Sequence, residues 1–181
     1  IDKIFVSSDS IDIIKIAKRE KVNYIIRPKK LAQKNSLELD AWKHAIKHIK
    51  KKKLIFDYFL SLPPTSPLKS TKDVKKLIYY FKNNRSDITL TVCKSHKSPF
   101  FNMVFKNKKN KVKLINKKKV NQNKIFEITT VGYIAKVDYI LKTKNLLSGS
   151  VNSIEIPRER AIDIDDEYDF KLAKLFYDAK K

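Results

Sequence analysis

The sequence has 181 residues, of which 42% are hydrophobic, 10% aromatic and 33% charged, and its formal net charge is +22. This length and composition are typical of one globular domain with a substantial core, and they exclude a disordered chain. No apolar run approaches the roughly 20 residues that a membrane-spanning helix needs, so no membrane partner is expected. The single cysteine, Cys93, excludes an internal disulfide framework and a cysteine-rich zinc site, and it makes the cytoplasm the default compartment.

The positive charge has two interpretations. Taken alone, a net charge of +22 indicates nucleic-acid binding. The basic residues are mostly dispersed lysines, however, and arginine, which bidentate recognition of phosphate and guanine prefers, is sparse. We therefore expect no nucleic-acid partner, and a basic module that binds RNA or another polyanion is kept as an alternative.

Strands and helices alternate through the first half of the chain. Apolar runs predict strands at residues 4–6, 24–26, 58–62 and 88–92. Apolar residues at helical spacing predict three helices between them: one capped by Ser10 with Ile13, Ile14 and Ala17 inward, one carrying Trp42 and Ile46 with Asn35 or Ser36 as its cap, and one opened by a capping box of Ser70 and Asp73. This alternation predicts an α/β fold with a doubly wound, mostly parallel sheet.

The pattern changes in the second half. Between residues 96 and 133 short strands alternate with lysine-rich turns, and residues 102–105 and 112–115 predict a hairpin. We therefore predict a core formed by residues 1–95 and 134–181, interrupted by a small β-rich insertion at 96–133. Such an arm often serves dimerisation, although an ordinary solvated hairpin fits equally well.

The end of the chain returns to the earlier pattern. It predicts a short helix at 137–142, a strand at 154–156, and a last helix that is capped by Asp166 and bears Phe170, Ala173 and Phe176.

The first candidate for a site is the loop Leu-Pro-Pro-Thr-Ser-Pro-Leu, residues 62–68. It follows a buried strand, and ligands of open α/β sheets bind beyond the carboxyl ends of the strands. Three prolines stiffen the loop, which presents the hydroxyls of Thr65 and Ser66 to a polyhydroxylated or charged ligand. A rigid connection without a ligand is equally compatible with the pattern.

The second candidate is Ile-Asp-Ile-Asp-Asp, residues 162–166. In an extended chain Asp163 and Asp165 lie on one side and the isoleucines on the other. Two close carboxylates repel each other unless a cation lies between them, and Mg²⁺ prefers oxygen ligands supplemented by water and substrate phosphates. The pair therefore predicts a magnesium–triphosphate site, also open to Mn²⁺. The alternative is a set of N-terminal helix charges favoured by the macrodipole.

The third candidate is formed by Ser7, Ser8 and Asp9, which end a strand and precede a helix. Backbone N–H groups at such a junction are free to bind an anion or a base edge, although Ser and Asp are also ordinary capping residues.

The cysteine and the histidines are not predicted to take part in catalysis or metal binding. Cys93 lies in an apolar run and is expected to be a buried structural thiol, and the histidines form no ligand or triad pattern and are expected at the surface.

Five motifs, in this order, resemble the acylneuraminate cytidylyltransferases. They are Val-Ser-Ser-Asp-Ser at 6–10, Arg-Pro with Leu-Ala at 27–32, Pro-Thr-Ser-Pro-Leu at 64–68, Phe-Asn-Met-Val at 101–104, and Pro-Arg-Glu-Arg-Ala-Ile-Asp-Ile-Asp at 157–165. The resemblance covers nearly the whole chain and implies a Rossmann-like nucleotidyltransferase fold. Kdo cytidylyltransferases are similar in fold but do not usually carry Pro-Thr-Ser-Pro-Leu, which favours a nine-carbon sugar.

The resemblance implies a magnesium-dependent enzyme that transfers CMP from CTP to a sialic-acid-like nonulosonic acid and releases pyrophosphate. It also implies a homodimer formed through the β-rich insertion. By the family motifs, Asp163 and Asp165 hold the metal, the nucleotide lies near Ser7, Ser8 and Asp9, and the sugar is bordered by Pro64, Thr65, Ser66, Lys119 and Thr129.

Three departures from the family pattern bear on these roles. Nothing here matches the basic Gly-Ser-Lys loop with which the family grips the triphosphate, so the chain on its own is expected to lack that grip. Pro63 stands where a Gln often precedes the Pro-Thr-Ser loop, and Lys119 and Thr129 stand in for a typical Arg and Asn. Legionaminic- or pseudaminic-type sugars are therefore alternatives to sialic acid, and a non-catalytic homologue is the alternative to an enzyme.

Overall fold

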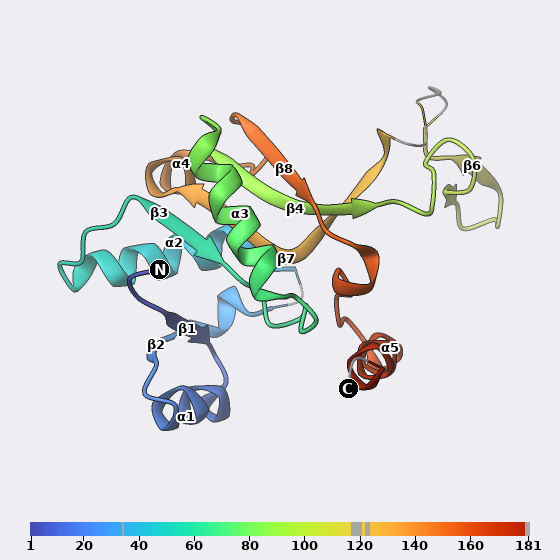
Figure 1. Cartoon of the computed structure of the whole chain (residues 1–181). Helices are drawn as coiled ribbons and strands as arrows, with labels where there is room; N and C mark the ends of the chain where they lie inside the picture. Colours follow the sequence, from blue (N-terminus) through green and yellow to red (C-terminus); the bar gives the residue numbers. More distant parts are fainter. Residues whose placement is uncertain (34, 117–120, 122–123, 180–181) are drawn as a thin grey trace. The chain divides into compact units, whose positions relative to one another are not determined.

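The structure is a computed structural model that describes residues 1–33, 35–116, 121 and 124–179, and it combines helices with strands throughout (Figure 1). The strands are β1 (Phe5–Ser8), β2 (Asn23–Ile26), β3 (Tyr58–Ser61), β4 (Ile88–Lys94), β5 (Val104–Lys106), β6 (Val112–Leu114), β7 (Phe126–Lys136) and β8 (Val151–Glu155). The helices are α1 (Ile11–Arg19), α2 (Glu38–Lys51), α3 (Thr71–Asn83), α4 (Val137–Lys142) and α5 (Glu167–Asp178), with 3-10 turns η1 (Lys29–Leu31) and η3 (Arg158–Arg160). None of these helices is both long and apolar enough to cross a membrane.

The described strands form three sheets. β1 and β2 pair in parallel, with Phe5 opposite Asn23 and Ser8 opposite Ile26. A four-stranded sheet has the order β3-β7-β4-β8, and β5 and β6 form an antiparallel hairpin. The predicted α/β class with a mostly parallel sheet is confirmed, and so is the predicted hairpin.

Contacts divide the chain into two compact units. Unit 1 comprises Ile1–Ser61, Ser86–Ile88 and Ala135–Val151, and unit 2 comprises Leu62–Arg85, Thr89–Ile134 and Asn152–Lys181. In unit 1, the side chains of Ile25, Ala45 and Ile49 form a buried cluster against which aromatic side chains pack. In unit 2, α3 buries Leu77 and Phe81.

The helices of unit 1 begin differently from each other. Ser10 caps α1 as predicted, and Ile14 and Ala17 are buried, but Ile13 is 46% exposed. The buried stripe of this short helix is narrow, and Ile13 lies outside it. The predicted caps of α2 are wrong, because the helix begins after Leu37 without a side-chain cap. The hydroxyl of Ser36 instead accepts from the N–H of Gln33 and donates to the carbonyl of Lys30.

The predicted caps of unit 2 are confirmed. Ser70 and Asp73 form a reciprocal capping box at the start of α3. Asp166 accepts hydrogen bonds from the N–H groups of Tyr168 and Asp169 at the start of α5. Of the apolar residues of α5 named from the sequence, Ala173 is buried and Phe170 is 51% exposed.

Strand β7 is the main element that sequence reasoning missed. The sequence predicts only short strands before residue 133, but Phe126–Lys136 is one strand of 11 residues that lies between β3 and β4 in the sheet order. Its second half is buried almost without interruption. A strand buried on both faces shows no alternation of polar and apolar residues from which its length could be predicted.

Candidate functional site

Two segments singled out in the sequence are joined by a main-chain hydrogen bond in unit 2. The N–H of Ile164 donates to the carbonyl oxygen of Thr65 at 2.9 Å. Ile164 separates the two predicted metal-binding residues, Asp163 and Asp165, and Thr65 is the centre of the predicted hydroxyl-bearing loop. The contact therefore brings the predicted carboxylate pair next to this loop, although about 100 residues separate them along the chain.

The two carboxylates differ in their surroundings. Asp163 is half-buried, and its Oδ1 atom is buried without a hydrogen-bond partner among the described residues. Asp165 is exposed, and its N–H donates to Oδ2 of Asp169 at 3.1 Å. A buried carboxylate oxygen with no donor is unfavourable unless a cation or a ligand compensates it. The buried Oδ1 of Asp163 is therefore a candidate ligand for a cation.

A magnesium ion fits this donor set. In the described part of the chain no group of three or more His, Cys, Asp or Glu side chains is placed to hold a metal. Two carboxylates suffice for Mg²⁺, because this ion usually retains several waters and takes the rest of its ligands from substrate phosphates. The unpaired Oδ1 of Asp163 and the exposed carboxylate of Asp165 supply oxygen donors of the preferred type.

Lys69 adds a cation near Asp163. Its ammonium group donates to the carbonyl oxygen of Pro63 at 2.6 Å, and this hydrogen bond joins the two ends of the proline-rich loop. Burial lowers the pKa of Lys69, and the charge of Asp163 opposes this shift only in part. Lys69 was not among the site residues predicted from the sequence. Its signal was a basic residue directly after the proline-rich loop, in a chain where lysine is too common for one to stand out.

The other predicted sugar-site residues occupy different environments. Pro64 is exposed, whereas Ser66 is fully buried and its hydroxyl shares a 2.6 Å hydrogen bond with that of Thr130. Thr129 is also buried, and its hydroxyl donates to the Thr91 hydroxyl at 2.7 Å. Thr130 is thus the residue of β7 that reaches the loop. Lys119 lies outside the described residues.

A bidentate ion pair adjoins this region. Nε and Nη2 of Arg160 donate to the two carboxylate oxygens of Asp73, each at 2.9 Å. Asp73 is 4% exposed and also accepts from the N–H and the hydroxyl of Ser70. Burial raises the pKa of Asp73, but the hydrogen bonds from Arg160 and Ser70 outweigh this effect, and the pKa lies below its usual value.

The predicted nucleotide residues lie in unit 1, at the end of β1. The hydroxyl of Ser8 accepts from the N–H of Ser10 at 3.1 Å, and the carbonyl of Ser8 accepts from the N–H of Arg27 at 2.9 Å. Asp9 is exposed, and its carboxylate lies 3.8 Å from the Arg27 guanidinium. The hydroxyl of Ser7 is buried and has no hydrogen-bond partner among the described residues.

Two more buried nitrogens near this strand end have no described partner. They are Nε of Arg27 and Nδ1 of His44. Burial lowers the pKa of His44, as do the nearby charges of His48 and Arg27. His96 is exposed as predicted, whereas His44 and His48 are half-buried. Arg27 was missed as a functional candidate, although an arginine directly after a parallel strand stands where α/β folds bind ligands.

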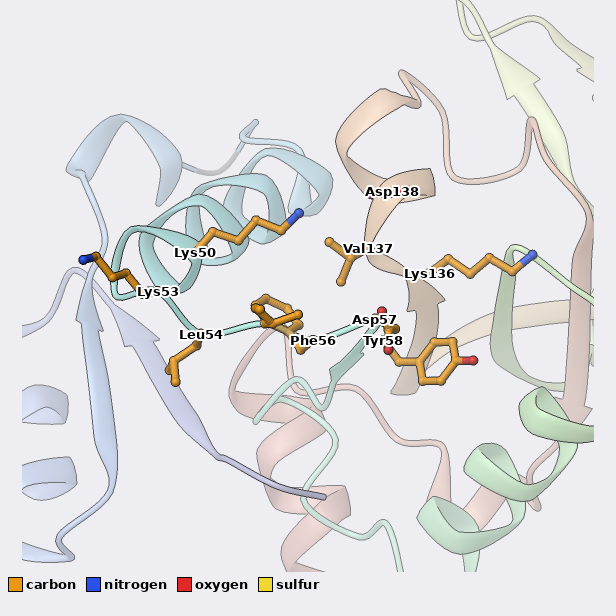
Figure 2. A pocket seen from close by; sticks show the side chains of 10 residues that line it. Lys50, Lys53, Leu54, Phe56, Asp57, Tyr58, Lys136, Val137 and Asp138 are labelled. Carbon is orange, nitrogen blue, oxygen red and sulfur yellow. The ribbon is translucent and has the colours of Figure 1, made fainter.

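Unit 1 also contains an open cavity of about 780 Å³ (Figure 2). Three lysines, Lys50, Lys53 and Lys136, line it together with the rings of Phe56 and Tyr58. Lys136 is already paired with Asp87 at 3.0 Å. None of the described residues predicted to bind nucleotide, sugar or metal lines this cavity. The cavity therefore does not contribute to the predicted site.

Comparison with known proteins gives relatives but no family model that matches. The chain is 25% identical over 185 residues to the post-translational flagellin modification protein B of Campylobacter coli, covering 98% of this chain and 77% of that protein. It is 27% identical over 190 residues to the N-acylneuraminate cytidylyltransferase of Escherichia coli. That alignment covers 95% of this chain but 41% of the relative, so the chain spans less than half of that enzyme.

Solved structures share the fold. The CMP:2-keto-3-deoxy-manno-octonic acid synthetase complexed with CTP superposes with a TM-score of 0.69 at 10% identity, over 100% of this chain and 83% of that one. The 4-diphosphocytidyl-2C-methyl-D-erythritol synthase of Anaerococcus prevotii also gives 0.69, at 14% identity, over 98% and 79%. Together the similarities confirm the resemblance to cytidylyltransferases, the fold, and the expected enzyme class of nucleotidyltransferase.

Proposed function

We propose that the protein is a cytidylyltransferase that transfers CMP from CTP to a sialic-acid-like nonulosonic acid and releases pyrophosphate, with Mg²⁺ held by Asp163 and Asp165. The observation that carries the proposal is the hydrogen bond from Ile164 to Thr65, next to the unpaired Oδ1 of Asp163. It supports one site that combines carboxylates for a metal with a stiff, hydroxyl-bearing loop. The likeness to a curated N-acylneuraminate cytidylyltransferase supports the substrate class.

The chemistry requires charge neutralisation and alignment rather than a covalent intermediate. A hydroxyl oxygen of the sugar acid loses its proton to water and forms a bond to the α-phosphorus of CTP. The bond from that phosphorus to the bridging oxygen breaks, and pyrophosphate leaves with the electron pair. When bound, Mg²⁺ offsets the negative charge of the phosphates. The protein residues orient the reactants in this proposal.

Four of the predicted residues are assigned roles in this reaction. Asp163 and Asp165 are the oxygen ligands. Thr65 borders the sugar, and Ser66 stiffens its loop through Thr130. The charge of Asp163 partly offsets the lowering of the Lys69 pKa by burial, and the ammonium group of Lys69 can attract the carboxylate of a sugar acid.

The nucleotide is assigned to the end of β1 in unit 1. Ser7, Ser8 and Asp9 lie there beside Arg27. The Ser7 hydroxyl and Nε of Arg27 have no hydrogen-bond partner in the described part of the chain, so both are available to a ligand. A guanidinium group suits phosphate oxygens because it donates in a planar fork.

A homodimer through the β5–β6 hairpin is also part of the proposal. All six residues of the two strands are exposed, including Phe105 at 67% and Val112 at 57%. Exposed apolar side chains on a protruding hairpin are typical of an interaction surface. Sedimentation of the full-length protein tests this assignment: a dimer that Phe105→Lys dissociates supports it, and a monomeric wild type rejects it.

The reaction itself is tested by pyrophosphate release from CTP and Mg²⁺, using the full-length protein and a panel of nine-carbon and eight-carbon keto-sugar acids. Release with a nine-carbon acid is expected. Release with an eight-carbon acid alone would keep the reaction and correct the substrate. A folded protein that releases none with any acid would reject the enzyme and leave the non-catalytic homologue or the polyanion-binding module.

A further inference from the structure

We propose that Asp73 and Arg160 are positioning residues whose ion pair holds the segment carrying Asp163 and Asp165 in its metal-binding arrangement. The catalytic consequence of this pair rests on the proposed function, whereas its effect on the segment does not. Neither residue touches the reacting groups in this account. Both act through the backbone that connects them to the carboxylates.

The pair has the geometry of a rigid anchor. Arg160 reaches Asp73 through two parallel hydrogen bonds of 2.9 Å, which is the fork-to-fork arrangement that fixes orientation as well as distance. Asp73 is itself held at the start of α3, where the N–H of Ser70 donates to Oδ2 at 2.9 Å and its hydroxyl at 2.7 Å. The arginine is therefore attached to a helix terminus that does not depend on it for its own capping box.

The anchor and the Ile164–Thr65 hydrogen bond lie on two sides of the same segment. Arg160 ends the 3-10 turn η3, and its own N–H donates to the carbonyl of Pro157 at 3.0 Å. Four residues further on, Ile164 is bound to Thr65 at 2.9 Å. Residues 161–163 are thus held at both ends. At one end the hydrogen bond of Ile164 attaches the segment to Thr65, and the chain continues from Thr65 to Ser70 and Asp73, the partner of Arg160.

Asp163 lies between these two attachment points. Its Oδ1 atom is buried and receives no hydrogen bond from the described residues, so the position of the carboxylate depends on its backbone. That backbone is fixed on either side. Without the Arg160 anchor, residues before Asp163 keep only the local hydrogen bonds of η3, from Arg160 to Pro157 and from Ala161 to Arg158. The backbone that leads into Asp163 is then free to shift relative to Ile164.

A merely structural ion pair is the competing explanation. Removing one partner of a buried pair destabilises a whole fold, because the other charge is left unpaired. The experiment must therefore separate local loosening of residues 161–165 from global destabilisation. The chain offers a matched control in Arg158, which lies in the same 3-10 turn, is exposed, and makes no ion pair with a described residue.

The test compares Arg160→Gln, Arg160→Lys and Arg158→Gln in the full-length protein without metal, by amide hydrogen exchange. The probe is the Ile164 N–H, and the reference is the Ile156 N–H, which donates to Val92 at 2.8 Å in the same unit. Arg160→Gln should accelerate Ile164 exchange about tenfold or more relative to Ile156, as expected for local opening. Arg158→Gln should leave this ratio within about twofold, and Arg160→Lys, which keeps the charge but not the fork, should fall between them.

Equal acceleration at Ile164 and Ile156, or no change at either, would overturn the proposal. If Arg160→Gln does not fold, the double variant Asp73→Asn/Arg160→Gln removes the pair without leaving a buried lone charge, and the same ratio is expected of it. Binding of Mn²⁺ alone provides a second readout, which Arg160→Gln should weaken about tenfold, a loss typical of residues that orient metal ligands.

Activity then separates the two proposals. If the wild type releases no pyrophosphate but the exchange ratio changes as stated, the proposed function fails and the positioning role stands. If the wild type is active and Arg160→Gln keeps both its kcat/KM and its Ile164 protection, the positioning role fails and the proposed function stands.

Discussion

The N–H of Ile164 lies 2.9 Å from the carbonyl oxygen of Thr65, and this contact joins the two most specific motifs of the sequence. Ile164 supplies only its backbone to the contact, so the carboxylates on either side of it remain available. The proline-rich loop in turn offers a rigid acceptor, because prolines at 63, 64 and 67 restrict its backbone. The arrangement explains how a site can be assembled from a loop and a segment that are remote in sequence.

Ser66 and Thr130 should be energetically coupled. Ser66 is fully buried and shares a 2.6 Å hydrogen bond with Thr130, so Ser66→Ala leaves the threonine hydroxyl without this partner. We expect Ser66→Ala to lower the free energy of unfolding by about 1–2 kcal/mol. In a double-mutant cycle with Thr130→Val, measured by urea denaturation, the coupling should be about 1 kcal/mol. The exposed Ser153→Ala is the matched control, and additive effects of the pair would contradict this assignment.

Asp73 should make the free energy of unfolding depend on pH in the acidic range. Its pKa is lowered, because hydrogen bonds from Arg160 and Ser70 outweigh the opposing effect of burial. For a carboxyl group with a lowered folded-state pKa, the stabilisation is present above the pKa of the unfolded chain and is lost as the pH falls through the folded-state pKa. Urea denaturation of the wild type and of Asp73→Asn/Arg160→Gln should therefore show a stability difference at pH 7 that shrinks below about pH 5. A stability difference that stays constant across this pH range would show that the ionisation of Asp73 does not contribute to it.

Cys93 should react slowly with thiol reagents in the native protein. Its side chain is 5% exposed, and burial raises the pKa of the thiol, so little reactive thiolate is present at neutral pH. Because the chain has one cysteine, a colorimetric thiol reagent reports on this residue alone. Modification should become rapid only in denaturant. Rapid stoichiometric reaction of the native protein would contradict the structural assignment.

Arg27 should contribute to CTP binding. Its Nε atom is buried without a described partner, beside the predicted nucleotide residues. Arg27→Gln is expected to weaken CTP about tenfold in calorimetric titration, since a charge-assisted hydrogen bond to phosphate is lost. The control is Arg19→Gln, which changes an exposed arginine paired with Glu20 at 3.0 Å. Equal affinities of Arg27→Gln and wild type would remove Arg27 from the nucleotide site.

The sequence predicted much of the fold because its signals are local. The capping box of Ser70 and Asp73 and the cap at Asp166 depend on residues three apart, and both are present. The alternation of strands and helices likewise gave the α/β class. β7 was missed because its burial depends on neighbours that are remote in sequence, and the cap of α2 was missed because Ser36 is engaged by Lys30 and Gln33.

The candidate site could likewise be predicted only in part. Residue types and motif order pointed to Asp163, Asp165 and Thr65, but not to the backbone contact that joins them. Lys69 and Arg27 were overlooked because their sequence signal, a basic residue after a loop or a strand, is weak in a lysine-rich chain. Their burial and the Nε of Arg27 that has no described partner are visible only in the structure. The assignment of the individual sugar- and nucleotide-binding residues stays a prediction.

The most direct test of the central claim is pyrophosphate release from CTP and a nine-carbon keto-sugar acid by the full-length protein, compared with Asp163→Asn and Asp165→Asn. Asp12→Asn, which changes an exposed carboxylate paired with Lys15, is the control. We predict release by the wild type and the control, and a loss of about a hundredfold or more in both site variants, as for other groups that stabilise transition-state charge. Wild-type rates in both site variants, from protein shown to be folded, would contradict the metal-dependent site proposed for this chain.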